Sequence, residues 1–298
     1  MSNSILLIGG ANIDYIATSQ YKLLMHSSNI GEIEISYGGV MRNVVENLSR
    51  LGNKCVFITA IGDDILGNKL KDYMGALGVD LKLPKTDKPT SSYLCVNDCD
   101  HDMFVGLNDM RIMEDLSPEF ICEHKKIIDE YDSVILDSNL SKESLKCIFN
   151  ECGDKKFYCE AISASKVIKF LPYLDKIYLL KCNINEAKSL LSSEENAAEL
   201  TLKILKTGVK KCVITQGKDD IYYGENGQVH FLKVDAVDNI TGNTTGCGDA
   251  MFAGIIDKLM IGKTLKEAIE FGEELSKLTL ETKKANNEDV SKLAYEHK

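Results

Sequence analysis

A glycine-rich turn near the C-terminal end of the chain is well suited to bind a phosphate. It has the sequence Thr244-Thr245-Gly246-Cys247-Gly248-Asp249 and leads into the apolar run 250–256, which predicts a buried helix. Glycines at a helix N-terminus let backbone N–H groups converge on an anion, and the helix dipole adds to the attraction. We therefore predict that Thr245, Gly246, Cys247 and Gly248 form an anion hole for a phosphoryl group in transfer.

Asp249 is the unusual member of this turn, because a carboxylate repels a phosphate. Its presence is explained if it accepts the proton of a hydroxyl group that attacks the phosphorus atom. The alternative is a helix cap or an acidic residue of the first helical turn, where Asp is favoured. Both interpretations remain open for this segment alone.

Polar side chains also follow the first expected strand, at 4–8. The pair Gly9-Gly10 begins as a dinucleotide-binding turn would, but the continuation through Asn12 and Asp14 lacks the third glycine of that motif. These two side chains are suited instead to hydrogen-bond the hydroxyl groups of a substrate. The alternative is that they only form Asx turns.

The elements that must position these residues alternate between strands and helices. Short apolar runs rich in β-branched residues predict strands at 4–8, 55–61, 133–137, 176–180 and 212–215. The stretches between them mostly have helical periodicity. This alternation predicts an α/β fold in which helices cover both faces of a mostly parallel sheet. Ligands of such sheets generally bind at the carboxyl ends of the strands.

Helix boundaries are predicted at several places. One helix, 39–51, opens at two glycines and carries an apolar stripe, with Arg42, Asn43, Glu46 and Asn47 towards its edge and other face. Two further helices are predicted at 248–260 and 264–280. Pro118 after Ser117 indicates another helix start, and Thr264 with Glu267 predicts a capping box.

Two stretches break the alternation, 21–37 and 91–105. The second alternates in polarity around a polar turn, which is typical of a hairpin. We expect the two stretches to pair into a small β-sheet, a lid built from about 15–37 and 91–106. The unpaired edges of such a sheet favour pairing with another subunit, which predicts a homodimer through the lid.

Length and composition restrict the class of protein. With 298 residues, 44% of them apolar, the chain is expected to form a single domain over 1–298. The net charge of −10 argues against a nucleic-acid partner. No apolar run reaches membrane-spanning length and no signal peptide is evident, so a cytoplasmic protein with ten reduced cysteines is expected. Cys95 and Cys99 near His101 approach a zinc motif but lack a second ligand pair.

The Gly-Cys-Gly-Asp sequence before a buried helix resembles the signature of the ribokinase-like (PfkB) carbohydrate and nucleoside kinases, and the similarity extends over nearly the whole chain. Segment 9–14 resembles the first substrate-binding segment of that family, and Gly38-Gly39 with Asn43 resembles the second. The resemblance implies that Asn12, Asp14, Gly38, Gly39 and Asn43 hold the hydroxyl groups of a sugar. It also implies a ribokinase-like fold and Asp249 as the catalytic base.

The nucleotide side of the site is implied by two shorter elements. Asn183 and Glu186 resemble the family's Asn-x-x-Glu element, which helps to place phosphates and, through water, Mg²⁺. Thr215 and Gly217 resemble its Thr-x-Gly turn against the nucleotide. ATP and Mg²⁺ are therefore expected, and an activating monovalent cation such as K⁺ is left open.

Within the family, segments 38–52 and 278–282, with Asn286-Asn287, resemble pseudouridine kinases. Segment 163–166 fits the same subgroup and brings Lys166 towards the site, although a surface lysine on a helix is the alternative. Departures from the family pattern are Cys182 where proline is common, Cys247 where alanine is usual and Asn243 where many relatives have an acid.

The resemblance thus predicts an ATP-dependent kinase that phosphorylates the 5′-hydroxyl of pseudouridine. One alternative is a kinase for another nucleoside or for a sugar such as ribose or fructose. The other, to which the departures at Cys182 and Cys247 lend weight, is a catalytically silent ligand-binding protein on the same fold.

Overall fold

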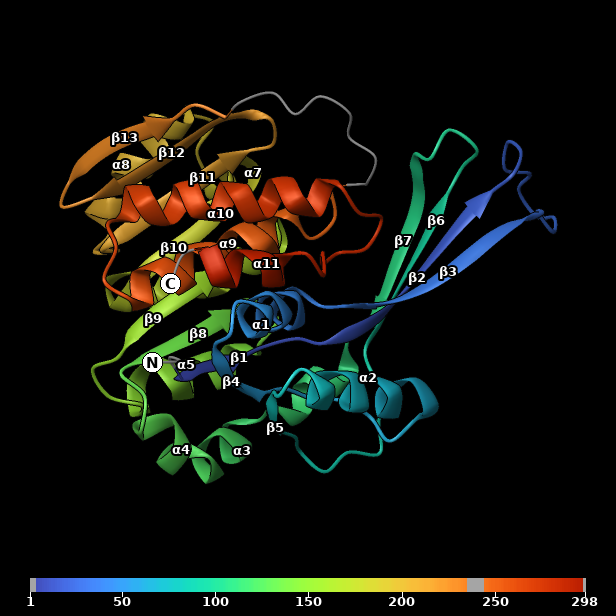
Figure 1. Ribbon diagram of the computed structural model, residues 1–298, viewed down its shortest axis with the longest axis horizontal. Coiled ribbons are helices and arrows are strands. Elements are labelled where there is room, and N and C mark those ends of the chain that lie inside the picture. The colour runs from blue at the N-terminus through green and yellow to red at the C-terminus, as the bar shows by residue number, and fades with distance from the viewer. Residues whose placement is uncertain (1–3, 235–243, 297–298) are drawn as a thin grey trace.

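The computed structural model describes residues 4–234 and 244–296. Within these residues, one large sheet contains the nine strands β1 (Ser4–Ile8), β4 (Lys54–Ile58), β5 (Asp80–Lys82), β8 (Ser133–Asp137), β9 (Lys156–Glu160), β10 (Ile177–Asn183), β11 (Lys211–Gln216), β12 (Asp219–Glu225) and β13 (Gln228–Leu232). Their spatial order is β13-β12-β11-β10-β9-β8-β1-β4-β5 (Figure 1). Every neighbouring pair is parallel except β11–β12 and β12–β13. The prediction of a mostly parallel sheet is therefore confirmed.

Helices cover both faces of this sheet, as predicted. One face carries α1 (Val40–Arg50), α2 (Ile65–Ala76), α9 (Cys247–Met260) and α10 (Leu265–Leu280), with α11 (Val290–Glu296) beside α1. The other face carries η1 (Arg111–Asp115), α3 (Pro118–Glu123), α4 (Lys125–Asp129), α5 (Lys142–Glu151), α6 (Ala164–Val167), η2 (Ile168–Lys176), α7 (Ile184–Leu191) and α8 (Ala197–Lys206). Strand β1 is buried on both sides, because Ile5 and Leu7 enter one core while Leu6 and Ile8 enter the other.

Local sequence signals determine several helix ends. The Ser117 side chain caps α3, and Pro118 occupies the first helical position. Thr264 and Glu267 form the predicted capping box at the start of α10. These polar groups satisfy backbone N–H groups that have no partner inside the helix.

The hairpin formed by β12 and β13 was not among the elements predicted from the sequence. Its turn is Asn226-Gly227, with φ of +53° and +75°, between the paired residues Glu225 and Gln228. Asn-Gly between two strands is a strong local hairpin signal, because both residues tolerate positive φ. The sequence therefore contains a local signal for this hairpin.

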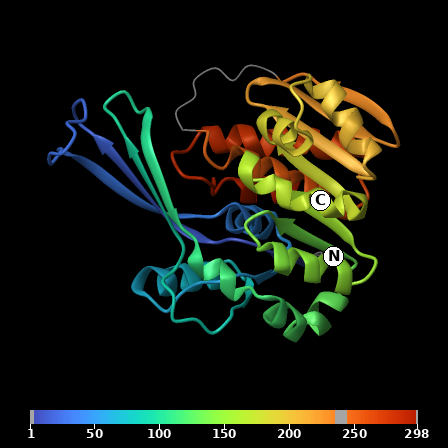
Figure 2. The same ribbon diagram turned by 180° about the vertical axis from the view of Figure 1, so that it is seen from behind.

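A second sheet projects from the body of the molecule next to α2 (Figures 1 and 2). Its strands are β2 (Asn12–Ser19), β3 (Gly31–Gly38), β6 (Ser92–Asn97) and β7 (Met103–Asp109), in the order β3-β2-β6-β7. The two segments predicted to form a lid supply most of these residues, although β2 already begins at Asn12. Whether the sheet acts as a lid, and whether 1–298 is a single domain, remain predictions.

The register gives this second sheet two different faces. Ile35, Tyr15, Leu94 and Leu107 are neighbours across the four strands and therefore share one face. Their sequence neighbours, among them Asp14, lie on the opposite face.

Among the described residues, none of the helices combines the length and the apolar composition that a membrane-spanning helix needs.

Candidate active site

The candidate site lies where the direction of strand succession in the large sheet reverses. From β1 the chain continues to β4 and β5 on one side, whereas β8 to β11 follow on the other side. Such a switch point leaves a crevice at the carboxyl ends of the two central strands, which is where open α/β sheets bind ligands. Gly10, which follows β1, donates its N–H to Asp137 Oδ2 at the end of β8, at 2.9 Å.

Three charged residues line the carboxyl ends of adjacent strands. Asp137, Glu160 and Lys181 are paired in register across β8, β9 and β10, and all three are buried. Lys181 Nζ lies 2.9 Å from Glu160 Oε1. The sequence analysis did not identify these residues, although a charged residue at the end of an apolar strand is a usable signal in a parallel sheet.

The charges at these strand ends affect one another. Burial raises the pKa of Glu160 to about 8, although Lys181 opposes this effect. Burial alone would lower the pKa of Lys181, but the carboxylates of Glu160, Asp249 and Glu186 outweigh it, so this pKa lies above its ordinary value. Lys181 therefore stays protonated and supplies a buried positive charge to the site.

Asp249 lies in the first turn of α9 and is 9% exposed. Its Oδ2 accepts a hydrogen bond from Asn43 Nδ2 on α1, at 2.6 Å. Burial raises the pKa of Asp249 to about 6, while the hydrogen bond from Asn43 and the charges of Lys181 and Arg42 lower it. The N-cap of α9 is Gly246, with no side-chain cap, so Asp249 does not occupy the N-cap position.

The glycine-rich turn has the conformation that an anion site at this helix requires. Gly246 has a φ of +84° and packs so closely on the carbonyl group of Ala285 that a Cβ atom would overlap it. The N–H of Cys247 donates to the carbonyl of Thr244 at 3.3 Å. Helix geometry leaves the next two amides, of Gly248 and Asp249, without an acceptor inside the helix.

Lys181 and the glycine-rich turn meet at Gly248. A Cβ atom at Gly248 would lie 2.9 Å from Lys181 Nζ, so a larger residue there would require the Lys181 ammonium group to move. The Cys247 thiol lies beside the Ser276 side chain on α10, away from this contact. Thr245 directly precedes Gly246, and Asn243 lies outside the described residues.

The residues predicted to bind the acceptor gather at the base of the second sheet. Asn12 and Asp14 lie in β2, so the Asx-turn interpretation is wrong, and the Asn12 amide donates to the Asp14 carboxylate. Gly38 lies directly against that carboxylate, and a Cβ on Gly39 would lie 2.7 Å from the carbonyl oxygen of Gly10. Burial raises the pKa of Asp14 to about 6, against the charge of Arg42. The structure therefore brings these residues to the switch point.

Lys166 is half-buried rather than free on a helix surface. Its Nζ donates to Asn139 Oδ1 at 2.7 Å, and Asn139 in turn donates to Asp137 Oδ2 at 3.3 Å. Burial lowers the pKa of Lys166, and the negative charge of Asp137 partly offsets this effect. Lys166 thus reaches the end of β8 through Asn139, a residue that the sequence analysis did not identify.

The residues predicted on the nucleotide side lie on neighbouring strand ends. Asn183 and Thr215 are paired in register across β10 and β11, and Gly217 follows directly after β11. Asn183 and Glu186 form a capping box at the start of α7: Asn183 Oδ1 accepts from the Glu186 N–H, and Glu186 Oε2 accepts from the Asn183 N–H. The first role of this Asn-x-x-Glu element is therefore to cap a helix.

Two acidic side chains near this edge, Glu160 and Glu186, are candidates to hold a magnesium ion, which would favour the ionised form of Glu160. Glu160 Oε2 is buried and has no hydrogen-bond partner among the described residues. Glu186 is 4% exposed, and its Oε2 makes the capping contact described above. An unpartnered buried carboxylate oxygen is costly, and a hard cation or its bound water would satisfy it.

Arg42 connects the residues predicted to bind the acceptor with Asn43, the partner of Asp249. Its guanidinium contacts the carbonyls of Tyr37 and Gly38, the Glu46 carboxylate and the Asn43 side chain. NH1 also donates to Asn286 Oδ1 at 3.0 Å, from the segment that follows α10. These contacts bury Arg42, Asn43 and Glu46, which the sequence analysis placed at the edge and other face of the helix. Asn47 is also buried and donates to the carbonyl of Asn43.

A cavity of about 560 Å³ lies outside this cluster, between α2 and the base of the second sheet. Its lining includes Ile13, Tyr15, Leu66 and Thr90. Side chains alternate along a strand, so Ile13 and Tyr15 are on the face of β2 opposite Asn12 and Asp14. This cavity is therefore separate from the predicted acceptor residues.

The fold and the site define an α/β kinase of small molecules, and comparison with known proteins gives the family. The chain belongs to the pfkB family of carbohydrate kinases, whose profile matches residues 2–292. It is 33% identical over 297 residues to the pseudouridine kinase of Escherichia coli K12, covering 96% of this chain and 93% of that protein.

Solved structures agree with this assignment. A carbohydrate kinase from Agrobacterium tumefaciens matches with a TM-score of 0.85 and 26% identity, over 99% of this chain and 96% of that chain. A ribokinase from Thermotoga maritima matches with a TM-score of 0.86 and 18% identity, over 99% of both chains. The chain is thus a phosphotransferase of a family of sugar and nucleoside kinases that use ATP and Mg²⁺. The predicted family and fold are confirmed.

Proposed function

We propose that the chain transfers the γ-phosphate of ATP to the 5′-hydroxyl of pseudouridine, giving ADP and pseudouridine 5′-phosphate. The observation that carries the proposal is the hydrogen bond from Asn43 Nδ2 to Asp249 Oδ2, at 2.6 Å, in the first turn of α9. It holds a buried carboxylate next to a helix N-terminus suited to a phosphate. Pseudouridine is favoured as the acceptor by the 33% identity to the Escherichia coli enzyme and by segment 38–52.

In the proposed reaction, Asp249 accepts the proton of the acceptor's 5′-hydroxyl. The oxygen then attacks the γ-phosphorus in line, and the bond from that phosphorus to the bridging oxygen of ATP breaks. A pKa near 6 suits this task, because the carboxylate is ionised at neutral pH and still basic enough to bind a proton. Asn12, Asp14 and Asn43 orient the ribose.

Negative charge grows on the oxygens of the transferred group as the bond breaks. The amides of the glycine-rich turn and the ammonium group of Lys181 are fixed in position before the reaction, so they stabilise this charge without reorganising. Glu186, through water, and Glu160 would hold Mg²⁺. When bound, Mg²⁺ neutralises charge on the β- and γ-phosphate oxygens.

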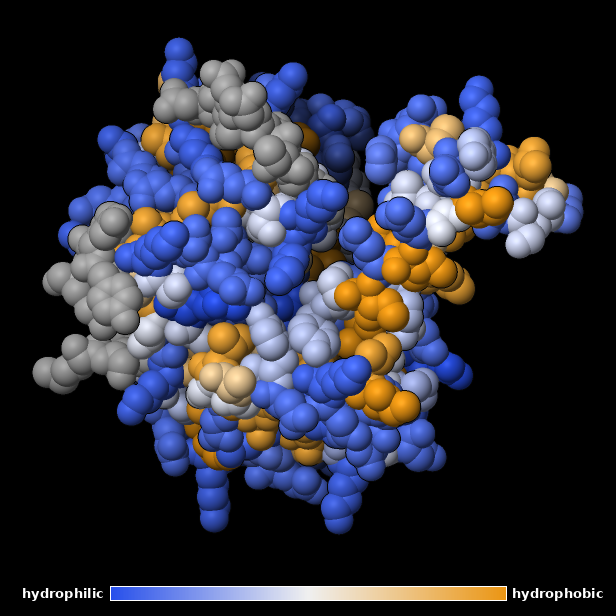
Figure 3. Space-filling model, turned by 45° about the vertical axis from the view of Figure 1, so that its right-hand side comes forward, coloured by the Kyte–Doolittle hydropathy of each residue, from blue (hydrophilic) through white to orange (hydrophobic). Residues whose placement is uncertain are grey.

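We assign the second sheet the role of the lid. The face that carries Asp14 covers the acceptor and excludes water, which would otherwise compete for the γ-phosphate. The opposite face presents Ile33, Ile35 and Leu107, exposed by 69%, 54% and 68%. Figure 3 shows apolar surface gathered along this sheet. An exposed apolar face of this kind supports a homodimer in which the lids of two subunits pack together.

An acceptor screen with MgATP tests the proposed function. ADP formation is measured with pseudouridine, uridine, adenosine, ribose and fructose, and mass and NMR spectra locate the new phosphate. We expect the highest kcat/KM with pseudouridine and phosphorylation at the 5′ position. Uridine is the matched control, because it has the same ribose and differs in how the uracil ring is attached.

The remaining outcomes separate the alternatives. Faster turnover of ribose, fructose or adenosine would replace the acceptor and leave the kinase mechanism intact. Binding of pseudouridine without ADP formation would indicate a silent ligand-binding protein on this fold. The Asp249→Asn variant measures the background in each assay.

A further inference from the structure

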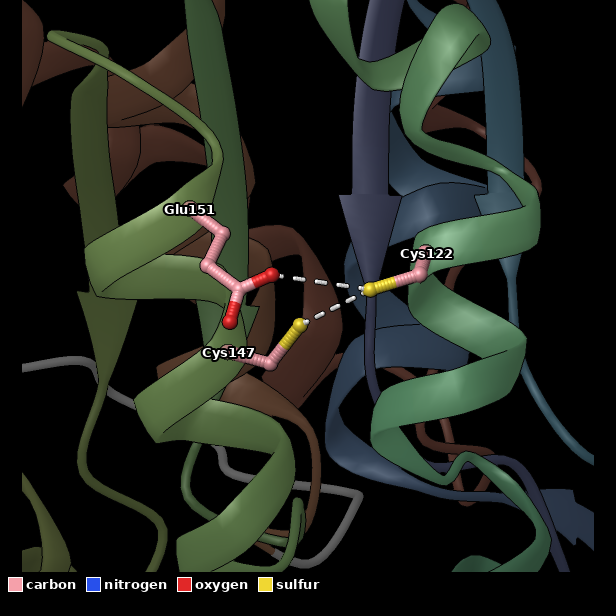
Figure 4. Close-up of side chains that lie close together, drawn as sticks. All are labelled: Cys122, Cys147 and Glu151. Carbon is pink, nitrogen blue, oxygen red and sulfur yellow. Dashed lines mark hydrogen bonds between the residues drawn. The ribbon is translucent and has the colours of Figure 1, made fainter.

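A second cluster of reactive side chains lies between α3 and α5, away from the candidate active site. It consists of Cys122 on α3 with Cys147 and Glu151, which lie one turn apart on α5 (Figure 4). Helix α5 starts after the carboxyl end of β8 and connects to the start of β9 at Lys156. Its last turn therefore lies towards the opposite edge of the sheet from the strand ends described above.

The three potential ligand atoms converge. Cys122 Sγ lies 3.6 Å from Cys147 Sγ and 3.7 Å from Glu151 Oε2, and all three atoms are within 4.8 Å of one another. Zinc binds thiolate sulfur at about 2.3 Å and carboxylate oxygen at about 2.0–2.2 Å in tetrahedral sites. Tetrahedral angles then place two sulfurs about 3.8 Å apart, and a sulfur and an oxygen about 3.6 Å apart. The two observed separations, 3.6 Å between the sulfurs and 3.7 Å between sulfur and oxygen, lie close to these values.

The surroundings of the cluster favour a cation. Cys122 and Glu151 are exposed, so an ion and one or more waters can reach the site from solvent, while Cys147 forms its buried floor.

We propose that Cys122, Cys147 and Glu151 form a binding site for a borderline-soft divalent cation of the zinc type, which links α3 to α5. Two sulfur ligands select such an ion over Mg²⁺, which prefers oxygen ligands and is the metal of the kinase reaction. The site is distinct from the strand ends that carry the phosphate chemistry. It does not depend on the identity of the acceptor.

A disulfide between Cys122 and Cys147 is the competing interpretation. The carboxylate of Glu151 would have no role in a disulfide. Glu151 Oε2 accepts a hydrogen bond from the Cys122 thiol, and a metal ion shared by the two groups would take the place of that proton (Figure 4). The geometry therefore favours the metal.

Cobalt and zinc titrations of the reduced, metal-free full-length chain test the site. We expect one Co²⁺ per chain, with thiolate-to-cobalt charge transfer and the visible bands of tetrahedral Co²⁺, followed by displacement with Zn²⁺. Zn²⁺ should also raise the melting temperature, because it binds the folded arrangement of α3 and α5. Cys122→Ser should weaken Zn²⁺ binding at least about tenfold, measured by competition with a chromophoric chelator.

Two variants make the result specific. Glu151→Gln is an exposed, nearly isosteric change that should weaken binding while both thiols remain. Cys99→Ser is the matched control and should bind like the parent, because Cys99 lies outside the cluster. The site is refuted by unchanged affinity in Cys122→Ser, by Co²⁺ bound without charge transfer, or by a Cys122–Cys147 disulfide in a chain whose reduced form takes up no metal.

Discussion

Asp249 and Asn43 form a hydrogen bond although 206 positions separate them in the chain. This contact bears directly on the two interpretations of Asp249. Asp249 is not the cap, because the N-cap is Gly246 and the Asp249 carboxylate accepts from a side chain of another helix. It does lie in the first turn of α9, where an acidic residue is favoured, so that part of the alternative stands. The contact supports the role of base, with Asn43 as the residue that positions it.

Asp249→Asn is the most direct test at this scale. The amide keeps the size of the side chain and can still accept from Asn43, but it cannot take a proton. We expect kcat to fall by roughly 10²–10⁴ while acceptor and MgATP still bind. Near-normal turnover would contradict the assignment of the base.

The Asp249→Asn substitution should also change the stability of the folded chain in a predictable direction. Folding raises the pKa of Asp249 from about 4 to about 6, so the ionised carboxylate costs stability once the pH exceeds that range. The neutral amide removes this cost. The melting temperature of Asp249→Asn at pH 8 should therefore be no lower than that of the parent, and any gain should shrink as the pH falls towards 4.

The pH dependence of kcat/KM should reflect the ionisation of Asp249. Because the base must be ionised, kcat/KM should fall about tenfold per pH unit below a pKa near 6. Asn43→Ala removes a hydrogen bond that lowers this pKa, so the acid limb should move to higher pH. Asp14 has a pKa that burial also raises to about 6. If the limb disappears in Asp14→Asn, Asp14 rather than Asp249 controls it.

At the scale of elements, the entrance to α9 shows how tightly the anion turn is built. Gly246 combines a positive φ with close packing on the backbone of Ala285, in the loop between α10 and α11. The same loop carries Asn286, which contacts both Arg42 and Asn43. One loop therefore supports the phosphate side and the acceptor side of the site together.

Gly246→Ala should disturb both conformation and packing. Gly262, at the other end of α9, is the matched control: its φ is +81°, and a Cβ there would meet open space. We expect Gly262→Ala to cost about 1–2 kcal/mol for the left-handed backbone alone. Gly246→Ala should cost about 1–3 kcal/mol more, because the Ala285 backbone must move, and should raise the KM for ATP. Equal denaturant midpoints for the two variants would show that the close contact is unimportant.

At the scale of the whole molecule, the proposed function assigns different tasks to the two faces of the second sheet. The face with Asp14 meets the acceptor side of the site, and the opposite face exposes a row of apolar side chains. A one-residue slip in register would exchange the two faces, so register determines both the acceptor contacts and the surface available to a second subunit.

The proposed dimer is tested by a charge on either face. Leu107→Lys places a charge in the apolar row and should shift the chain from dimer to monomer in sedimentation or light-scattering measurements, because a buried unpaired charge is costly. Asn108→Lys adds the same charge to the adjacent position on the opposite face and should leave the dimer intact. A parent chain that is monomeric at micromolar concentration would rule out this interface.

Sequence alone determined the features that depend on neighbouring residues or on periodicity. Alternating apolar runs gave the parallel sheet, Thr264 and Glu267 gave a capping box, and the glycines before Asp249 gave the phosphate-suited helix start. Each of these signals acts within a few residues, through backbone hydrogen bonds or one face of a helix or strand. Together with the family resemblance, they were sufficient for the fold and the class of reaction.

Tertiary structure decided which polar residues meet. Lys181 lies against Gly248 because β10 ends beside the start of α9, and Arg42 is buried because the loop with Asn286 covers it. Cys122 meets Cys147 because α3 packs on α5. These pairings depend on strand order and helix packing, which bring together residues that are distant in sequence and leave no periodic trace along the chain. For that reason, the sequence pointed to the glycine-rich turn, whereas only the fold showed that Asn43 contacts Asp249 and that Lys181 places a buried positive charge beside the turn.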